Sequence, residues 1–366
     1  MTAGPPKAMH GGRSARRRYQ TARPSAPNMP RPRPAATASG RGCNMKLDGN
    51  RFVIIGRAGM DFYPDPPGTK TEAATQFFAC LGGSSANIGV AICKLGGQVD
   101  LVTCVSDDAI GRFALNQLDH YGIGRAHVRS VGGEARNSLA VVETRIEDHQ
   151  SVIYRNGAAD FEMTDSDVSG VDYTAYDALI TTGTVFAAEP SRSATFLAFE
   201  LAKAAGLPLI LDIDYRPYSW ASADEAAEVY SRAGAMCDVI VGNDVEFGFM
   251  AGDYDRGLDK ARELVARGAS LAVYKMGEKG AITITPQGEV MTGIYSTDAL
   301  KPTGAGDSFL GGFVAGLADG LAVRDAVLQG SAAAAIVVSR VGCAPAMPTR
   351  ADLDSFLRTN VAPTAA

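Results

Sequence analysis

Several sequence patterns that mark whole classes of protein are missing from this 366-residue chain. No uncharged apolar run reaches the length of about 18 residues that a membrane-spanning helix needs, so no partner membrane is expected. The six cysteines show no C-x-x-C spacing and the four histidines form no H-E-x-x-H pattern, so no zinc site is indicated. We therefore expect buried thiols in a reducing compartment and a cytoplasmic location.

The familiar nucleotide-binding signatures are also absent. No G-x-x-x-x-G-K-[ST] sequence occurs, which excludes a P-loop enzyme, and no G-x-G-x-x-G follows an expected strand, so a dinucleotide-binding fold is unsupported. The H-R-D and D-F-G pair of the protein kinases is missing as well. Any nucleotide chemistry must therefore use a different phosphate-binding turn.

Acidic residues dominate most of the chain. Lys and Arg number 35 and Asp and Glu 40, but residues 1–45 hold nine of the basic residues and no acidic one. The rest therefore carries 26 basic against 40 acidic residues. Because nucleic-acid binding depends on neutralising phosphates, we expect no nucleic-acid partner. An apolar content of 46% is typical of a globular protein with a large core.

The first 45 residues differ from the remainder. They are rich in Pro, Arg, Ala, Ser and Gly without helical or strand periodicity, so we expect a disordered basic tail. A transit peptide, or upstream sequence translated from a start assigned too early with Met45 as the working start, are the other interpretations. The repeated prolines fit a targeting helix badly and favour the mis-assigned start. We expect one folded domain over 46–360 and a disordered tail over 361–366.

From residue 46 onward, short apolar runs alternate with helical patterns. Strands are expected at 52–55, 99–105, 178–182, 208–213, 239–241 and 271–274, and helices at 84–95, 110–121, 191–205, 222–235 and 256–267. This alternation predicts an α/β fold with a mainly parallel, doubly wound sheet, in which ligands bind at the carboxyl ends of the strands. Residues 137–154 break the rhythm and predict a β-hairpin of a size to act as a lid.

The most informative segment is KPTGAGDSFLGGFVAGLADG, residues 301–320. A turn of small residues, Gly304, Ala305 and Gly306, leads into a helix whose unpaired first amides carry partial positive charge. Without large side chains in the way, a phosphoryl group can approach these amides closely. Asp307 lies in that first turn, where a carboxylate is placed to take a proton from an attacking hydroxyl.

Two other interpretations of this segment compete with a phosphate site. A plain turn with an acidic residue near a helix start would have the same sequence. Gly306–Phe309 also resembles the GDS block of an esterase family, but a serine nucleophile needs a histidine base, and no histidine follows His149. The esterase interpretation is therefore rejected, and the plain turn stays open.

Two segments together give a specific resemblance. LGGSSANIGVAICKLG, residues 81–96, and KPTGAGDSFLGGFVAGL, residues 301–317, are similar to the N-terminal and C-terminal motifs of the ribokinase-like carbohydrate kinases, the PfkB family. The resemblance implies a three-layer sandwich with a mainly parallel sheet and a small β lid from about 61–80 and 134–160. It also implies a sugar kinase that uses ATP and Mg²⁺ and, as in some members, a monovalent cation.

The same resemblance implies roles for residues at the sugar. Asp307 would be the general base, and the turn 304–306 would be the anion hole. Asp61, Gly83 and Asn87 would bind the sugar, because a carboxylate can accept two hydroxyls and an amide can both donate and accept. An amide on a helix surface and an ordinary Gly-Gly turn are the structural alternatives for Asn87 and Gly83.

A metal site is implied by Asn243 and Glu246, which stand in the N-x-x-E spacing of the family's metal-and-phosphate motif. Since Mg²⁺ keeps several of its waters, the carboxylate would hold it through water. The alternative is a helix N-cap three residues before an acid, which is a common pattern in its own right.

The nucleotide side of the site is implied by two further segments. Lys275, Gly277 and Gly280 in KMGEKG match the loop beside the ATP phosphates, although a plain hairpin turn fits the glycines equally well. Residues 330–339 match the helix that packs by adenine. Most members carry Asn where Ser331 stands here, and Ser331 is expected to take its place at the nucleotide.

Three arginines bear on the choice of sugar. Arg57, Arg155 and Arg216 near one pocket would suit an acidic small-molecule sugar, because guanidinium binds carboxylate in a fork. Surface ion pairs or contacts with the ATP phosphates are the alternatives, and Arg216 suits the phosphates best.

The segments around Arg57 and Arg216, together with residues 337–349, resemble the family members that phosphorylate 5-dehydro-2-deoxy-D-gluconate in myo-inositol catabolism. A 2-keto-3-deoxygluconate kinase and a fructokinase are the alternatives within the family, and a non-catalytic sugar or nucleotide sensor is the alternative outside catalysis. One departure is Lys301-Pro302-Thr303, where many members have an Asp-Thr-Thr-like run. Members often pair, so a homodimer is a further expectation.

Overall fold

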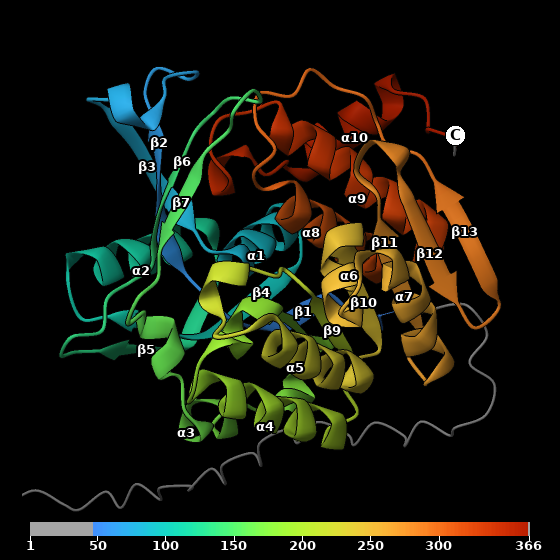
Figure 1. Ribbon diagram of the computed structural model, residues 1–366, viewed down its shortest axis with the longest axis horizontal. Coiled ribbons are helices and arrows are strands. Elements are labelled where there is room, and N and C mark those ends of the chain that lie inside the picture. Colours follow the sequence, from blue (N-terminus) through green and yellow to red (C-terminus); the bar gives the residue numbers. More distant parts are fainter. Residues whose placement is uncertain (1–46, 365–366) are drawn as a thin grey trace, which may run out of the picture. The chain divides into compact units, whose positions relative to one another are not determined.

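The central feature of the protein is a nine-stranded sheet, seen in a computed structural model that describes residues 47–364 (Figure 1). The strand order is β13-β12-β11-β10-β9-β8-β1-β4-β5, parallel from β11 to β5 and antiparallel at β12 and β13. The strands are β1 (Arg51–Ile55), β4 (Gln98–Ser106), β5 (Gly124–Val131), β8 (Ala178–Thr182), β9 (Leu209–Asp212), β10 (Val239–Asn243), β11 (Leu271–Lys275), β12 (Ala281–Thr285) and β13 (Gly288–Thr292). The predictions for 1–45 lie outside the described residues, and of the predicted tail 361–366 only 361–364 are described, which form no helix or strand.

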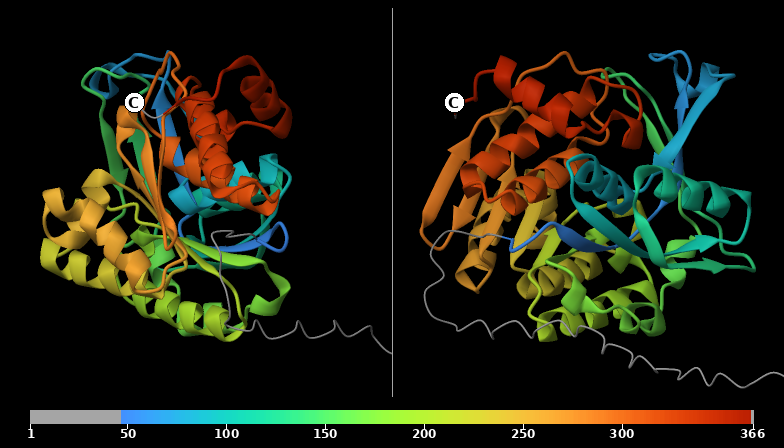
Figure 2. Two further views of the ribbon diagram at one scale, coloured as in Figure 1. Left: turned by 90° about the vertical axis from the view of Figure 1, so that its right-hand side faces the viewer. Right: turned by 180° about the vertical axis from the view of Figure 1, so that it is seen from behind.

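Helices cover both faces of this sheet, because its inner strands alternate apolar side chains toward either side. In β1, Val53 and Ile55 join one apolar core, and Phe52 and Ile54 join the other. Figure 2 shows the two helical layers. The first layer holds α3 (Asp165–Ser169), α4 (Ser191–Ala204), α5 (Ala223–Met236), α6 (Asp244–Ala251) and α7 (Gly257–Ala266). The second holds α1 (Ser84–Lys94), α2 (Ala109–Tyr121), α8 (Ala305–Ala318), α9 (Val323–Val338) and α10 (Arg350–Thr359).

A second, four-stranded sheet stands beside the first in the order β3-β2-β6-β7 (Figure 1). Its strands are β2 (Gly59–Pro64), β3 (Phe77–Gly82), β6 (Leu139–Val142) and β7 (Ser151–Tyr154). The antiparallel pair β6–β7 is the predicted hairpin, which is confirmed. Large apolar side chains of this small sheet are exposed, including Phe77 at 41%, Phe78 at 45% and Tyr154 at 61%. Exposed apolar patches are typical of interaction surfaces, but the homodimer itself stays a prediction.

The predicted fold class is confirmed, a three-layer α/β sandwich with a mainly parallel sheet and a small second sheet. Each strand and helix expected from periodicity is present within a few residues of its predicted ends. The edge strand β5 was not predicted, because it carries Arg125, His127 and Arg129 in an edge position where charge is tolerated. Among residues 47–364, no helix is long and apolar enough to cross a membrane.

The two motif helices, α1 and α8, pack against each other through small residues. A Cβ added at Gly311 of α8 would lie 2.3 Å from the Cβ of Ala91 on α1. A Cβ at Gly312 would lie 2.9 Å from the Cβ of Ala333 on α9. The helix α8 is therefore held between two neighbours at a separation that only glycine permits, and its first turn is fixed in relation to α1.

Candidate active site

Polar side chains gather where the parallel strands end, as expected for a doubly wound sheet. Arg57 follows β1, Asp61 lies on β2 of the small sheet, and Asp212 and Asp214 end or follow β9. From the next two strands come Asn243 at the end of β10 and Lys275 at the end of β11. The helices α1, α6 and α8 begin at this same edge, and α1 and α8 contribute Asn87 and Asp307.

Asp307 contacts Asn87 directly, which brings the two sequence motifs together. The Nδ2 of Asn87 donates to Oδ2 of Asp307 at 2.9 Å. Burial and the nearby Asp214 carboxylate raise the pKa of Asp307 to about 7, against the opposing effects of the Asn87 hydrogen bond, Arg216 and Arg57. A carboxylate with a pKa near the working pH is suited to accept a proton. The alternative of Asn87 as a surface amide is wrong, since this side chain is 3% exposed.

The turn that precedes Asp307 has the geometry of an anion-binding turn. Gly304 is the N-cap of α8 with a φ of 86°, and a Cβ there would lie 2.8 Å from Sγ of Cys343. A Cβ at Gly306 would meet only the Nζ of Lys275, at 3.7 Å. The first amides of α8 and a lysine ammonium therefore surround one position, where negative charge is favoured.

The side chain of His149 brings the small sheet into contact with this turn. Thr303 Oγ1 and His149 Nε2 lie 3.3 Å apart, and His149 belongs to the loop between β6 and β7. The hairpin tip therefore contacts the residue that precedes Gly304.

Asp61 lies against Gly82 and Gly83, two positions where no larger residue would fit. A Cβ at Gly82 would lie 1.9 Å from Oδ1 of Asp61, and one at Gly83, whose φ is 94°, would lie 2.4 Å from the carbonyl oxygen of Arg57. Burial raises the pKa of Asp61 to about 6, while Arg57 and Lys301 lower it. The ordinary-turn alternative is thus wrong, because the glycines make room for the Asp61 carboxylate and for close backbone approach.

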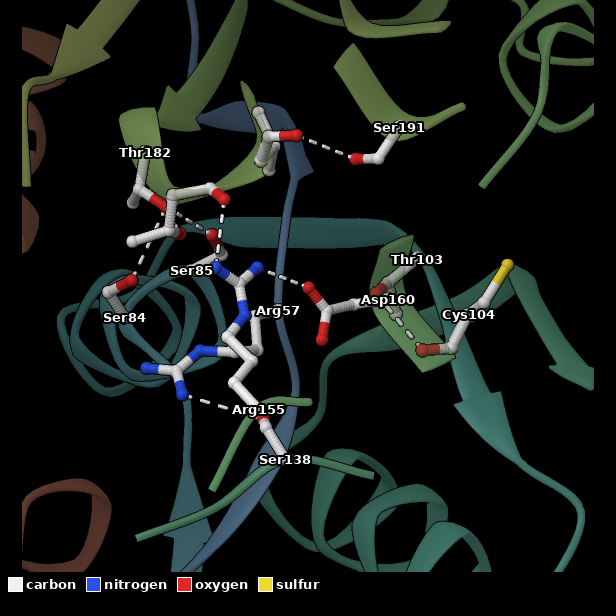
Figure 3. Close-up of polar contacts among 12 residues, drawn as sticks. Arg57, Ser84, Ser85, Thr103, Cys104, Ser138, Arg155, Asp160, Thr182 and Ser191 are labelled. Atoms are coloured by element: carbon white, nitrogen blue, oxygen red, sulfur yellow. Dashed lines mark hydrogen bonds and ion pairs between the residues drawn. The ribbon is translucent and has the colours of Figure 1, made fainter. Parts of the chain in front are cut away.

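The three arginines differ in the partners they have, and Figure 3 shows Arg57 and Arg155. Arg155 forms a buried ion pair with Asp160 (Figure 3). It also donates to the carbonyl oxygen of Thr184 at 2.9 Å and stacks on Phe161. These contacts satisfy a structural role, and the substrate role of Arg155 stays a prediction that they do not favour. Arg57 is 8% exposed and makes one long hydrogen bond, 3.4 Å to Oγ of Ser138.

Arg216 is the most exposed of the three. It pairs with Asp214 at 2.5 Å and donates to the carbonyl oxygen of Tyr215 at 3.0 Å. Its side chain is 40% exposed, so it remains accessible to a ligand.

An acidic cluster follows β9 that sequence reasoning missed. Burial and neighbouring carboxylates raise the pKa of Asp212, and burial with Asp214 raises that of Glu246, while Lys275 opposes both shifts. Among the described residues, Oδ2 of Asp214 is buried without a hydrogen-bond partner. The signal was available, because two aspartates follow a buried strand in the segment DIDYRP.

Asn243 and Glu246 form a capping box at the start of α6. Oε2 of Glu246 accepts from the Asn243 amide at 2.7 Å, and Oδ1 of Asn243 accepts from the Glu246 amide at 2.9 Å. The capping alternative is therefore confirmed, and it does not exclude a ligand, because a carboxylate has a second oxygen. Asp214 raises the pKa of Glu246 and has one buried oxygen without a partner, and among residues 47–364 no group of three His, Cys, Asp or Glu side chains could hold a metal ion directly. These oxygens therefore suit only a Mg²⁺ that keeps its waters.

The remaining residues predicted to bind the nucleotide lie in the turn between β11 and β12 and on helix α9. Gly277 and Gly280 flank the turn between β11 and β12 with φ values of 58° and 88°, which glycine adopts readily. Ser331 on α9 accepts a hydrogen bond through Oγ from the Tyr295 amide at 3.3 Å. Their nucleotide contacts stay predictions.

The raised pKa of Asp307 predicts an acid limb in the activity. Because protonated Asp307 cannot accept a proton, kcat/KM should fall about tenfold per pH unit below an apparent pKa near 7. An Asp214→Asn variant, which removes the like charge, should move this limb to lower pH. A pH profile of initial rates measures both. A wild-type limb at the ordinary aspartate value near 4 would contradict the assignment.

Sequence relatives identify the family to which this geometry belongs. Residues 50–350 match the family described as pfkB family carbohydrate kinase. A 5-dehydro-2-deoxygluconokinase from Photobacterium profundum is 36% identical over 313 residues, which are 84% of this chain and 94% of the relative.

Two solved structures are similar in fold and sequence. Fructokinase from Vibrio cholerae O395, bound to fructose, ADP and calcium, is 26% identical, with a TM-score of 0.75 over 85% of this chain and 99% of that chain. A double mutant of that enzyme, bound to fructose, ADP and potassium, is 25% identical, with a TM-score of 0.74 and the same coverage. The chain belongs to the pfkB family of carbohydrate kinases.

Proposed function

We propose that the protein transfers the γ-phosphate of ATP to the hydroxymethyl group of an acidic keto-sugar, 5-dehydro-2-deoxy-D-gluconate, and so forms its 6-phosphate. The observation that carries the proposal is the contact between Asp307 and Asn87 at the first turn of α8. It joins a carboxylate able to take a proton, an amide able to hold a hydroxyl, and helix amides able to hold a phosphate. The name of the relatives at 36% and 35% identity supports this choice of sugar.

The transfer needs positioning and charge stabilisation more than covalent help from the protein. The sugar hydroxyl gives its proton to Asp307 as its oxygen bonds to the γ-phosphorus, and the bond from that phosphorus to the bridging oxygen breaks to release ADP. The amides of Ala305 and Gly306 and the ammonium of Lys275 stabilise the charge that develops on the phosphoryl oxygens. Asn243 and Glu246, with Asp214, would hold Mg²⁺ through water, and the ion would neutralise phosphate charge when bound.

Unpartnered polar atoms support a sugar site beside Asp307. Within residues 47–364, Oδ1 of Asn87 and Nε of Arg57 are buried without a hydrogen-bond partner. Buried polar atoms are normally paired, so these two atoms are suited to bind polar groups of a ligand. Of the three arginines, Arg57 has the most hydrogen-bonding capacity left, and we assign it to the substrate carboxylate.

A substrate panel tests the proposal. ADP release should be fast with 5-dehydro-2-deoxygluconate and slow with 2-keto-3-deoxygluconate and fructose. Arg57→Gln should raise KM for the acidic sugar about tenfold or more, which is the loss of one charge-assisted hydrogen bond, and should raise KM for fructose much less. Arg129→Gln, which removes a surface ion pair with Asp167, is the matched control.

The alternatives predict different results in the same assay. Strong turnover of fructose with none of the keto-acids would remove the acidic sugar. Thermal stabilisation by sugar and nucleotide without any ADP release would make the protein a sensor.

A further inference from the structure

Lys301 is a buried charge of an uncommon kind. Its side chain is 0% exposed. The Nζ donates to the backbone carbonyl oxygen of Thr303 and, at 3.4 Å, to that of Val337. Among the described residues, no carboxylate lies within ion-pair distance of this ammonium. Backbone carbonyl oxygens therefore take the place of water and of a counter-ion, which is how proteins also surround a small monovalent cation.

The position of Lys301 connects it to the phosphate turn. One of its carbonyl partners, Thr303, directly precedes Gly304, the N-cap of α8. The other, Val337, lies near the C-terminal end of α9, where the Lys301 and Leu300 amides also donate to the carbonyl oxygen of Val338. The ammonium thus fixes a carbonyl next to the turn to a neighbouring helix.

The charge of Lys301 also acts on the acidic groups of the site. Burial lowers the pKa of Lys301, the carboxyls of Asp307 and Asp61 oppose that shift, and Lys301 in turn lowers the pKa of Asp61. Cys343 lies nearby, but burial raises its pKa to about 12, so it is a neutral thiol at neutral pH and no counter-ion. The ammonium therefore acts on these carboxyls from beyond ion-pair distance, and among the described residues it forms no salt bridge of its own.

Burial of an ammonium without a paired carboxylate is costly, and an apolar side chain of similar length would avoid the cost. A lysine at this position therefore has a physical reason only if its positive charge acts on the site and offsets the cost of burial. A dissociable monovalent cation such as the potassium in the fructokinase relative does not fit beside it, because the carbonyls of Thr303 and Val337 are already engaged and like charges repel.

We propose that Lys301 acts as a built-in monovalent cation, whose ammonium orients the 303–306 turn toward the phosphate and makes phosphoryl transfer independent of added potassium. Lys301 is thus a positioning residue. The tests that measure activity rest on the proposed function, whereas the test that measures thermal unfolding does not. It replaces the expectation of a monovalent cofactor with a residue of this chain.

Cation dependence of the wild-type protein is the first test. At constant ionic strength, kcat and KM for ATP should change less than about twofold when tetramethylammonium is replaced by sodium or potassium. Screening of surface charges is then the same in all three salts, and Lys301 already supplies the positive charge. Saturable activation by potassium but not by sodium would overturn the proposal.

Two substitutions separate charge from space. Lys301→Ala removes the ammonium and frees the two carbonyls, so kcat should fall about tenfold or more in tetramethylammonium, and potassium should restore a large part of it. Lys301→Met fills the same space without charge and should stay slow with either cation. Lys203→Ala, at an exposed position on α4, is the control. Wild-type activity in Lys301→Met would overturn the proposal.

Thermal unfolding without sugar or ATP gives a readout that does not depend on catalysis. Potassium should raise the Tm of Lys301→Ala in a saturable way and leave the Tm of the wild type and of Lys301→Met unchanged. If no sugar is phosphorylated by any of these proteins, the proposed function fails, and this measurement still decides the role of Lys301. Equal potassium effects on all three Tm values would overturn it.

Discussion

Replacing Asp307 with asparagine is expected to lower kcat by at least about a hundredfold while ATP binding is retained. Asparagine keeps the size of the side chain and can still accept from Nδ2 of Asn87 through its amide oxygen. What is lost is the ability to take a proton from the sugar hydroxyl. Initial rates and isothermal titration with ATP measure the two effects separately.

The same substitution has an expected effect on stability with a defined sign. Because the pKa of Asp307 is raised in the folded protein, its ionisation costs stability as pH rises from about 4 through about 7. Asp307→Asn removes that cost, so its Tm should exceed the wild-type Tm at pH 8, and the difference should shrink at pH 5. Turnover near the wild-type rate, or a Tm gain that is larger at pH 5, would refute the role of Asp307.

Replacing Gly304 with alanine is expected to lower kcat/KM about 10²–10³-fold, the effect of losing one aligned donor at a developing negative charge. The added methyl must fit a φ of 86° and would lie 2.8 Å from Sγ of Cys343. The turn must therefore move, and with it the amides that face the phosphate.

Gly320 provides the matched control just beyond the other end of the same helix. Its φ is 79°, and no atom lies within 4 Å of the place where a Cβ would stand. Gly320→Ala therefore carries the same backbone strain, about 1 kcal/mol, without contact with the site. Thermal unfolding should register both variants, whereas the kinetics should register only Gly304→Ala. Equal kinetic loss in the two would indicate that strain alone is responsible.

The regular elements could be predicted because periodicity reports burial. Strand β8 is buried throughout and mostly apolar, and α2 alternates at helical spacing between an exposed and a buried face. The edge strand β5 escaped because its exposed positions are charged, so its sequence lacks the apolar signal on which the prediction depends.

Site residues could be predicted where the backbone conformation or a close neighbour allows only one residue type. Glycine at 83 and 304 is required by positive φ and close neighbours, and both positions were identified from the motifs. The partner of a side chain could not be predicted in the same way. An arginine looks the same in the sequence whether it binds a substrate or, as Arg155 does, pairs with Asp160. Lys301 looked like a departure from a family pattern, because the two carbonyls that surround it belong to the backbone and leave no trace in the sequence.

The glycine contact between α1 and α8 limits how this protein can respond to its substrates. Since Gly311 rests on Ala91, the helix that carries Asn87 and the helix that carries Asp307 form one rigid unit. Any rearrangement that encloses a sugar is then expected outside this helix pair, for example in the small sheet, whose hairpin tip contacts Thr303 through His149. Such a movement would leave Asn87 and Asp307 in the same alignment throughout the turnover cycle.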